Sequence, residues 1–571
     1  MKRLYIVCMA LFAIMASSCN NETDLFPLSE GSADLWYADE TEVLMSISSL
    51  YKIGYWTMVP DDFTDDWFNR DAVTVVTGGT VTSDYWETNA YWTRAYQVIT
   101  QANAILEAFE QQSVIDLLEP DVYAAYMAEA RFVRAAQYGF LTFLYGDVVY
   151  CDSTMTIDEA FEMGRTSKEE VMEYIYEDFD YAIENLPTSY SSSETQRATK
   201  SAAYALKARY ALYNDDYATA ATAAKACMDL GQHSLHSDYE NLFLQSTKNS
   251  SESIFVFPRS VTYSEVYPIK SQYFLPRCPG GWATHSPSWD LVASYLCTDG
   301  LPIDESPLYD PCNPFVNRDP RMAVTCTEVA KDYTVAYHGY EYDPNPYSTT
   351  ITNYNTGAEV ANNDTRSVAT YASYNGLLWR KGIDDTWFDN SYQTEQDMIY
   401  IRLADVMLIY AEAKIEQNSI DSSVLDAMNQ VRARAYGVDS SDTSSYPAIT
   451  TTSQSELRSI LRVERRMEFA FEELRYMDII RWRIATDVLN RPNYGMLDSE
   501  TLKTKVVDAG LWFFPGTPDI DENGTPDYSA MESAGLIQKF ATRSFPDRQY
   551  LWPIPSTEVT INSNITQNSG Y

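Results

Sequence analysis

The sequence has few of the residues that carry out most enzymatic chemistry. It contains only four histidines and no HExxH, GxSxG or glycine-rich phosphate loop. Basic residues are also scarce: 41 Lys and Arg stand against 81 Asp and Glu, a net charge of −40. Such a charge repels phosphate backbones, which excludes a nucleic-acid partner. Carboxylates are too numerous for any spacing to single out a catalytic pair, so we expect no enzyme.

Closely spaced cysteine pairs are absent as well, so no zinc site is expected. Four cysteines between positions 278 and 326 predict one or two local disulfides, whose connectivity stays open. No cofactor is required, but a structural calcium ion is a candidate. The predicted calcium ligands are Asp519, Asp521, Asn523 and Asp527. Their alternation, with Gly524 at the turn, is that of the first half of a calcium loop. The alternative is a plain acidic turn, because Ala530 stands where a calcium loop ends in an acid.

Long apolar runs are missing except at the start of the chain. Lys2 and Arg3 precede an apolar run over residues 4–16, which is too short and wrongly flanked to span a bilayer. Residues 1–18 are therefore predicted to be a cleaved signal peptide. Cys19 follows at the cleavage point, which predicts lipidation of its thiol and of the new amino terminus. An ordinary signal peptide is the alternative.

Helical periodicity covers much of the remaining chain. It predicts helices over 121–145, 168–186, 199–213, 217–230, 398–417, 424–436 and 453–483, and a short strand over 253–257. Small residues in the 199–230 pair follow a tetratricopeptide-like rhythm. Helical patterns fail between about 232 and 395, where Tyr, Trp, Pro and Gly dominate. We therefore expect an N-terminal helical region over 19–231 and a second region over 232–571, with aromatic loops at 278–395.

Several motifs, spread in order along the mature chain, resemble the SusD/RagB family of outer-membrane nutrient-binding lipoproteins of the Bacteroidetes. The most specific run is Glu464 to Glu472 with Arg475 and Asp478. Residues 551–555, near the end of the chain, resemble another motif of the family. The resemblance implies a mostly α fold, an α-solenoid-like scaffold with about four tetratricopeptide-like helix pairs and a loop-rich C-terminal half. It also implies a lipid anchor in the outer membrane, a body exposed at the cell surface and a SusC-like TonB-dependent transporter as partner.

The function implied by the resemblance is non-catalytic capture of an oligosaccharide or polysaccharide for import. Oligopeptide capture, as the RagB name implies, remains an alternative, and a surface glycoside hydrolase is the least favoured. The sequence does not name the sugar, its linkage or its chain length. The carboxylates of Glu464, Glu468 and Glu472 stand among arginines, which predicts structural ion pairs rather than acid–base catalysis.

Glycan binding calls for exposed aromatic rings, because a sugar presents a C–H face that stacks on Trp or Tyr. Loop positions with Asn or Asp beside the ring are the best candidates. The predicted platform is led by Trp86, with Trp67, Trp282, Tyr342, Trp387, Asn69 and Asn89 as companions. The alternative for Trp86 is burial beneath its own loop.

Overall fold

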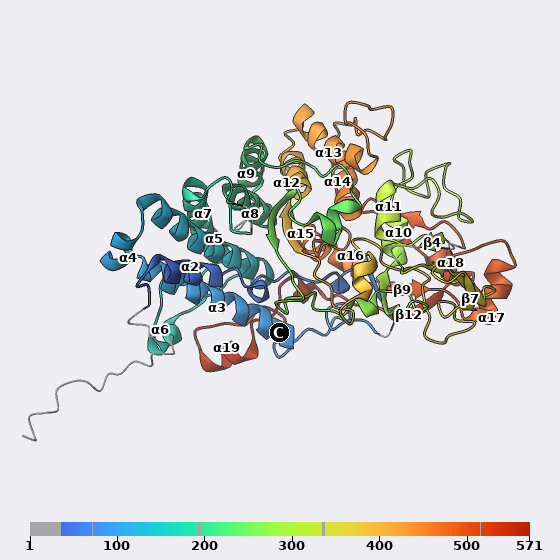
Figure 1. Cartoon of the computed structure of the whole chain (residues 1–571), viewed down its shortest axis with the longest axis horizontal. Coiled ribbons are helices and arrows are strands. Elements are labelled where there is room, and N and C mark those ends of the chain that lie inside the picture. Colours follow the sequence, from blue (N-terminus) through green and yellow to red (C-terminus); the bar gives the residue numbers. More distant parts are fainter. Residues whose placement is uncertain (1–35, 71, 192–195, 330, 334–336, 514) are drawn as a thin grey trace, which may run out of the picture.

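Helices form most of the regular structure (Figure 1). The computed structural model describes residues 36–70, 72–191, 196–329, 331–333, 337–513 and 515–571, so the leader and Cys19 lie outside the described residues. The helices are α2 Glu40–Ser49, α3 Trp86–Ala108, α4 Gln112–Leu117, α5 Pro120–Tyr145, α6 Ile157–Glu162, α7 Lys168–Asn185, α8 Lys200–Tyr213, α9 Tyr217–Asp229, α10 Trp289–Ser294, α11 Pro320–Thr325, α12 Leu403–Glu416, α13 Ser422–Ala435, α14 Gln454–Phe469, α15 Arg475–Arg481, α16 Ala485–Leu489, α17 Ser499–Leu502, α18 Ser529–Ser533 and α19 Ser556–Ile561.

The long helices pack in chain order. α3 lies on α5, α5 on α7, α7 on α8, α8 on α9 and α9 on α12, which in turn contacts α13 and α14. The mostly α fold expected from the sequence is confirmed, and the order of packing is consistent with successive helix pairs. Within the residues described, no helix combines the length and apolar composition needed to cross a membrane.

Most of the strands are short, antiparallel and located in the second half of the chain. The strands are β1 Trp67–Asn69, β2 Ser253–Phe257, β3 His285–Pro287, β4 Lys331–Tyr333, β5 Tyr340–Tyr342, β6 Thr350–Asn353, β7 Ala358–Ala361, β8 Met398–Arg402, β9 Pro492–Gly495, β10 Asp519–Ile520, β11 Pro526–Asp527 and β12 Gln538–Thr542. One sheet has the order β4-β5-β6-β7; the other pairs are β1–β3, β2–β8, β9–β12 and β10–β11. The strand expected at 253–257 is confirmed as β2.

Two of the expected helices differ from the structure at one end. Residues 398–402 were expected to be helical but form β8, because their apolar side chains pair with β2. The helix expected over 453–483 breaks after Phe469, and Phe471 and Glu473 adopt left-handed backbone conformations with φ of 61° and 60°. Lys381 stabilises the break, since its Nζ donates to the carbonyls of Glu468 (3.2 Å) and Ala470 (2.9 Å). Burial lowers the pKa of this amine to about 8.

Two large apolar cores, and a small third cluster around Phe243, are found in the described part of the chain. The first fills the space among α2, α3, α5, α7, α8, α9, α12 and α15, and the second lies under the loops of residues 274–303, 377–387 and 494–537. α14 belongs to both: Leu457 and Leu461 enter the first core, whereas Val463 and Met467 enter the second. α14 therefore joins the two cores, and the division expected at 231/232 stays a prediction.

The disulfides expected between positions 278 and 326 are wrong for the described chain. Cys278, Cys297, Cys312 and Cys326 are all free thiols. Cys297 and Cys326 are buried in separate β-bridges, the first with Arg318 and the second with Trp379, so the backbone holds them on different segments.

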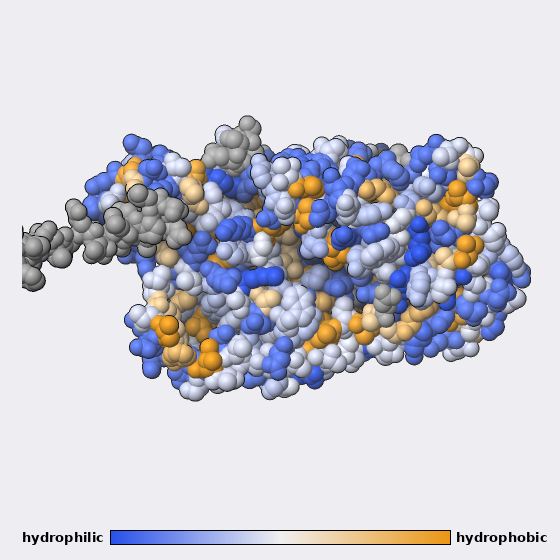
Figure 2. Space-filling view, turned by 60° about the horizontal axis from the view of Figure 1, so that its bottom comes forward, coloured by the Kyte–Doolittle hydropathy of each residue, from blue (hydrophilic) through white to orange (hydrophobic). Residues whose placement is uncertain are grey.

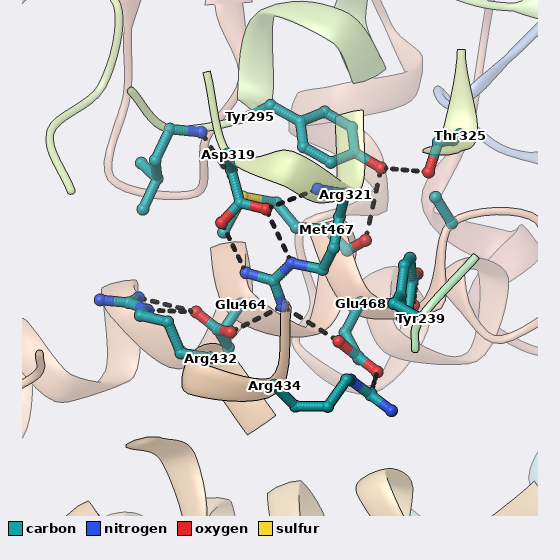
Figure 3. A network of polar contacts seen from close by, with 12 residues as sticks. Tyr239, Tyr295, Asp319, Arg321, Thr325, Arg432, Arg434, Glu464, Met467 and Glu468 are labelled. Atoms are coloured by element: carbon teal, nitrogen blue, oxygen red, sulfur yellow. Dashed lines mark hydrogen bonds and ion pairs between the residues drawn. The ribbon is translucent and has the colours of Figure 1, made fainter. Parts of the chain in front are cut away.

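Buried charges surround α14 where the two cores meet (Figure 3). Arg321 of α11 reaches Glu464 at 2.7 Å and Glu468 at 3.0 Å, and all three side chains are fully buried. Arg432 of α13 lies 2.7 Å from Glu464, and Arg434 also pairs with Glu468. The carboxylates are therefore structural, as predicted, but their partners come from other elements rather than from their own helix.

The buried arginines of α14 pair with aspartates of other segments and not with the glutamates of their own helix. Arg465 pairs with Asp405 and Asp478, each at 2.9 Å, and Arg466 pairs with Asp65 at 2.8 Å. Burial raises the pKa of the Glu468 carboxyl, but the charges of its arginine partners outweigh burial and hold that pKa well below its usual range. Each buried charge on α14 is thus compensated by an opposite charge.

Neutralising one of these carboxylates is expected to destabilise the whole fold. Glu468→Gln leaves the charges of Arg321, Arg402 and Arg434 without this acceptor, so the free energy of unfolding should fall by about 3–5 kcal/mol. The exposed Lys225–Asp229 pair supplies the control, because Asp229→Asn should cost under about 1 kcal/mol. Urea unfolding followed by circular dichroism measures both. Equal midpoints for the two variants would contradict the account.

Candidate functional site

An exposed aromatic group with a fixed cation lies at the end of the β1–β3 pair. In this pair Trp67 stands opposite Pro287 and Asn69 opposite His285. The backbone N–H of Arg70 continues the pairing and donates to the carbonyl of Thr284 at 3.0 Å. Arg70 therefore leaves a rigid two-stranded support rather than a free loop.

A tight backbone crossing turns Trp282 outward beside Arg70. A Cβ on Gly281 would lie 2.1 Å from the carbonyl oxygen of Leu275, so only glycine fits there. The Trp282 N–H donates to the carbonyl of Gln272 at 2.7 Å, which fixes the next residue as well. The Trp282 ring remains 39% exposed.

The Arg70 guanidinium joins three segments that are distant in sequence. Its Nη1 donates to the carbonyls of Trp282 (3.2 Å) and Tyr371 (2.6 Å). Its carbon lies 5.4 Å from the ring centre of Tyr371 and 5.8 Å from that of Tyr374. Tyr273 completes the group, with its ring centre 4.7 Å from that of Trp282. We call Arg70, Tyr273, Trp282, Tyr371 and Tyr374 the Arg70 cluster.

The Arg70 cluster combines flat apolar faces with a fixed hydrogen-bond donor. Tyr371 is 60% exposed, and Tyr374 is half-buried between Arg70 and Arg366, whose guanidinium carbon lies 4.5 Å from its ring centre. Rings held in this way need little further ordering when a ligand stacks on them. The arrangement suits a hydroxyl-rich ligand with an apolar face.

Three residues of the predicted platform belong to the second core instead. Trp67, Tyr342 and Trp387 are buried, which leaves no ring face for a ligand. Trp67 packs against Phe274, Trp379 and Phe471, with ring centres 5.7–5.8 Å apart. The Tyr342 hydroxyl donates to the Gly376 carbonyl at 3.0 Å, and Trp387 packs near Trp379 and Phe274. The prediction that these three rings face a ligand is corrected accordingly.

The other predicted residues are accessible. Trp86 is the first residue of α3 and is 64% exposed, and Asn89 is exposed one turn further along the helix. Trp86 contacts Tyr85, whose ring packs against the buried Trp552. Asn69 is half-buried on β1, directly before Arg70. A ligand-binding role for Trp86, Asn69 and Asn89 stays a prediction.

The predicted calcium loop forms a β-hairpin turn. Asp519 and Asp527 are opposite each other in the β10–β11 pair. Asp521 Oδ1 accepts the backbone N–H groups of Asn523 (3.0 Å) and Thr525 (2.9 Å), and its Oδ2 lies 3.3 Å from Arg491. Asn523 Oδ1 accepts from Arg462 at 2.7 Å. Among the residues described, no group of three or more His, Cys, Asp or Glu is placed to hold a metal ion.

Four members of the Arg70 cluster were not among the predicted site residues: Arg70, Tyr273, Tyr371 and Tyr374. Tyr371 and Tyr374 fall within the aromatic loops expected at 278–395 but were not singled out there, and Arg70 meets Tyr371 across 301 positions. The one local signal was the Gly280-Gly281 pair before Trp282, which marks a close backbone approach.

Comparison with known proteins gives consistent matches over the chain. The profile of the SusD family matches residues 240–571, and a second profile, described as starch-binding and associating with the outer membrane, matches residues 41–212. SusD-like protein P2 of Formosa agariphila is 27% identical over 503 residues, which are 85% of this chain and 80% of that protein.

Solved structures show the same fold. A SusD-like carbohydrate-binding protein from Bacteroides fragilis superposes with a TM-score of 0.74 at 26% identity, covering 93% of this chain and 100% of that one. Surface glycan-binding protein A from Bacteroides fluxus superposes with a TM-score of 0.62 at 18% identity, covering 94% and 100%.

Proposed function

Because the chain belongs to the SusD family, we propose that it captures an oligosaccharide or polysaccharide at the bacterial surface without cleaving it. The observation that carries the proposal is the Arg70 cluster, in which the exposed rings of Trp282 and Tyr371 flank a guanidinium. Sugar contacts are individually weak, so several pre-positioned rings are what a glycan binder needs.

The charge of the whole protein opposes a polyanionic glycan, since the net charge is −40. The Arg70 cluster is locally basic, because Arg277 and Arg366 also contact its residues. Hydroxyl groups of a sugar are suitable acceptors for such guanidinium groups.

Absence of catalysis is part of the proposal. The closely placed carboxylates of α14 are buried and paired with arginines, so they are poor candidates for a glycosidase pair. The outer-membrane association named by the second matching profile supports a surface location. We further propose delivery of the captured glycan to a SusC-like TonB-dependent transporter, beside which a tethered body would hold its ligand at high local concentration.

Removing single rings from the Arg70 cluster should weaken glycan capture without unfolding the protein. Affinity electrophoresis and calorimetry of residues 20–571 against polysaccharide and peptide panels would identify the ligand. Trp282→Ala and Tyr371→Ala should each weaken binding at least about tenfold, because central aromatic contacts carry most of the affinity. Their melting temperatures should stay near that of the unchanged protein, since both rings are exposed.

Two variants serve as controls. Tyr263→Ala removes a still more exposed ring that lies outside the cluster and should leave affinity unchanged. Trp67→Ala removes a core ring and should cost about 3–5 kcal/mol of stability.

Two other outcomes would contradict glycan capture without cleavage. Binding of peptides alone, with little loss of affinity when single rings are deleted, would favour oligopeptide capture. Release of reducing ends from a glycan would show that the protein is an enzyme.

The lipid anchor is the second testable part of the proposal. Mass spectrometry of the protein from bacterial membranes should find acyl chains on an amino-terminal Cys19, and Cys19→Ser should release the body from the membrane fraction. An unmodified Cys19 would contradict the anchor but leave the glycan site untouched.

A further inference from the structure

An apolar groove lies between α3, α6 and α19. It measures about 680 Å³. Its walls include Trp92 and Tyr96 of α3, Ile157 and Phe161 of α6, and Ile561 of α19. In Figure 2, where the lower side of Figure 1 comes forward, apolar side chains gather at the lower left, at the end of the molecule where α6 and α19 lie.

The groove keeps large apolar side chains in contact with solvent. Ile157 is 76% exposed, Ile561 is 60% exposed and Phe161 is also exposed. Single exposed apolar residues are common on protein surfaces, but a contiguous patch around a groove marks a place where something binds.

The charge around the groove restricts which kind of ligand can occupy it. Glu558 of α19 lines the groove, and Asp158 and Glu162 are exposed on α6, next in sequence to the lining residues Ile157 and Phe161. These acids oppose an anionic lipid surface as the occupant. An apolar peptide segment fits the groove better.

We propose that the groove binds the chain's own segment Leu25–Leu28. This segment, Leu-Phe-Pro-Leu, is a short apolar run within the polar residues that follow Cys19. Its proline favours an extended backbone, which suits a groove between helices. Residues 25–28 lie outside the described part of the chain, so the proposal rests on their sequence and on the groove.

The start of the described chain is close enough for this docking. The Trp36 indole donates to Ser46 of α2 at 2.6 Å, and Ser49, about one turn further on, accepts from Gln101 of α3. Gln101 is next to Thr100, which lines the groove. The residues between Leu28 and Trp36 can span at most about 28 Å, which covers this short path along α2 and α3.

Docking would shorten the tether between membrane and body. Free residues 19–36 can span up to about 60 Å, whereas residues 19–25 alone span about 20 Å. If Cys19 carries the anchor proposed above, a docked segment would keep the α6–α19 end of the body within about 20 Å of the membrane. The docking itself does not depend on the anchor or on the glycan site.

Cys151 offers a native reporter, because its half-buried thiol lines the groove. The test uses the mature chain with Cys19→Ser, compared with the same chain carrying Leu25→Ser, Phe26→Ser and Leu28→Ser. Thiol labelling of Cys151, followed by peptide mass spectrometry, should be at least about threefold faster in the triple variant. The exposed Cys312, which lies on another part of the fold, should be labelled at equal rates in both and serves as the internal reference.

Hydrogen exchange provides the second readout. The amides of Phe26 and Leu28 should exchange at least about tenfold more slowly than free peptide, and Ile157→Ser with Phe161→Ser should remove this protection. Ile115→Ser, an exposed apolar residue on α4, is the matched control and should leave protection intact. Protection should increase with salt, because Asp24 and Glu30 then repel the acidic rim less.

Three results would overturn the proposal. The first is equal Cys151 labelling in both chains with unprotected amides at residues 26 and 28. The second is protection that grows with protein concentration, which would identify a second copy as the occupant. The third is protection of the groove only after lipid vesicles or a barrel partner are added, which would identify an external surface.

Discussion

Compensation of buried charge along α14 is the constraint on which the rest of the structure depends. The helix passes between two apolar cores and carries Glu464, Arg465, Arg466 and Glu468 in full burial. An uncompensated charge there would cost several kcal/mol, so each one requires an opposite charge from another element. The elements α11, α12, α13, α15 and β8 supply those charges, and their positions follow from this requirement.

The same network reaches the candidate site. Arg466 pairs with Asp65 and Asp66, which stand immediately before β1, and Arg475 also binds Asp65. β1 then leads directly to Arg70, and Trp67 fixes the strand to the second core. The exposed rings around Arg70 thus rest on a support anchored by buried ion pairs. A weak ligand such as a sugar gains most from a surface held in place before it arrives.

Local patterns predicted the helical part well and the site poorly, for physical reasons. Helices such as α5 and α7 have periodic apolar faces and clear ends, at Gly146 and at the Ser167 N-cap, so their bounds were readable from sequence. Residues 398–402 suit strand as well as helix, and the partner strand β2 lies far earlier in the chain. Trp67 was expected at the surface because acidic residues precede it. Those acids are in fact buried, where Asp65 forms ion pairs with the buried Arg466 and Arg475.

The most direct measurement is a crystal structure of residues 20–571 bound to an oligosaccharide selected from the panel. The account predicts a sugar ring stacked on Trp282 or Tyr371, with a hydroxyl accepting from the Arg70 guanidinium and the backbone of the cluster unmoved. A glycan bound elsewhere, for example over Trp86 with the Arg70 cluster empty, would contradict it.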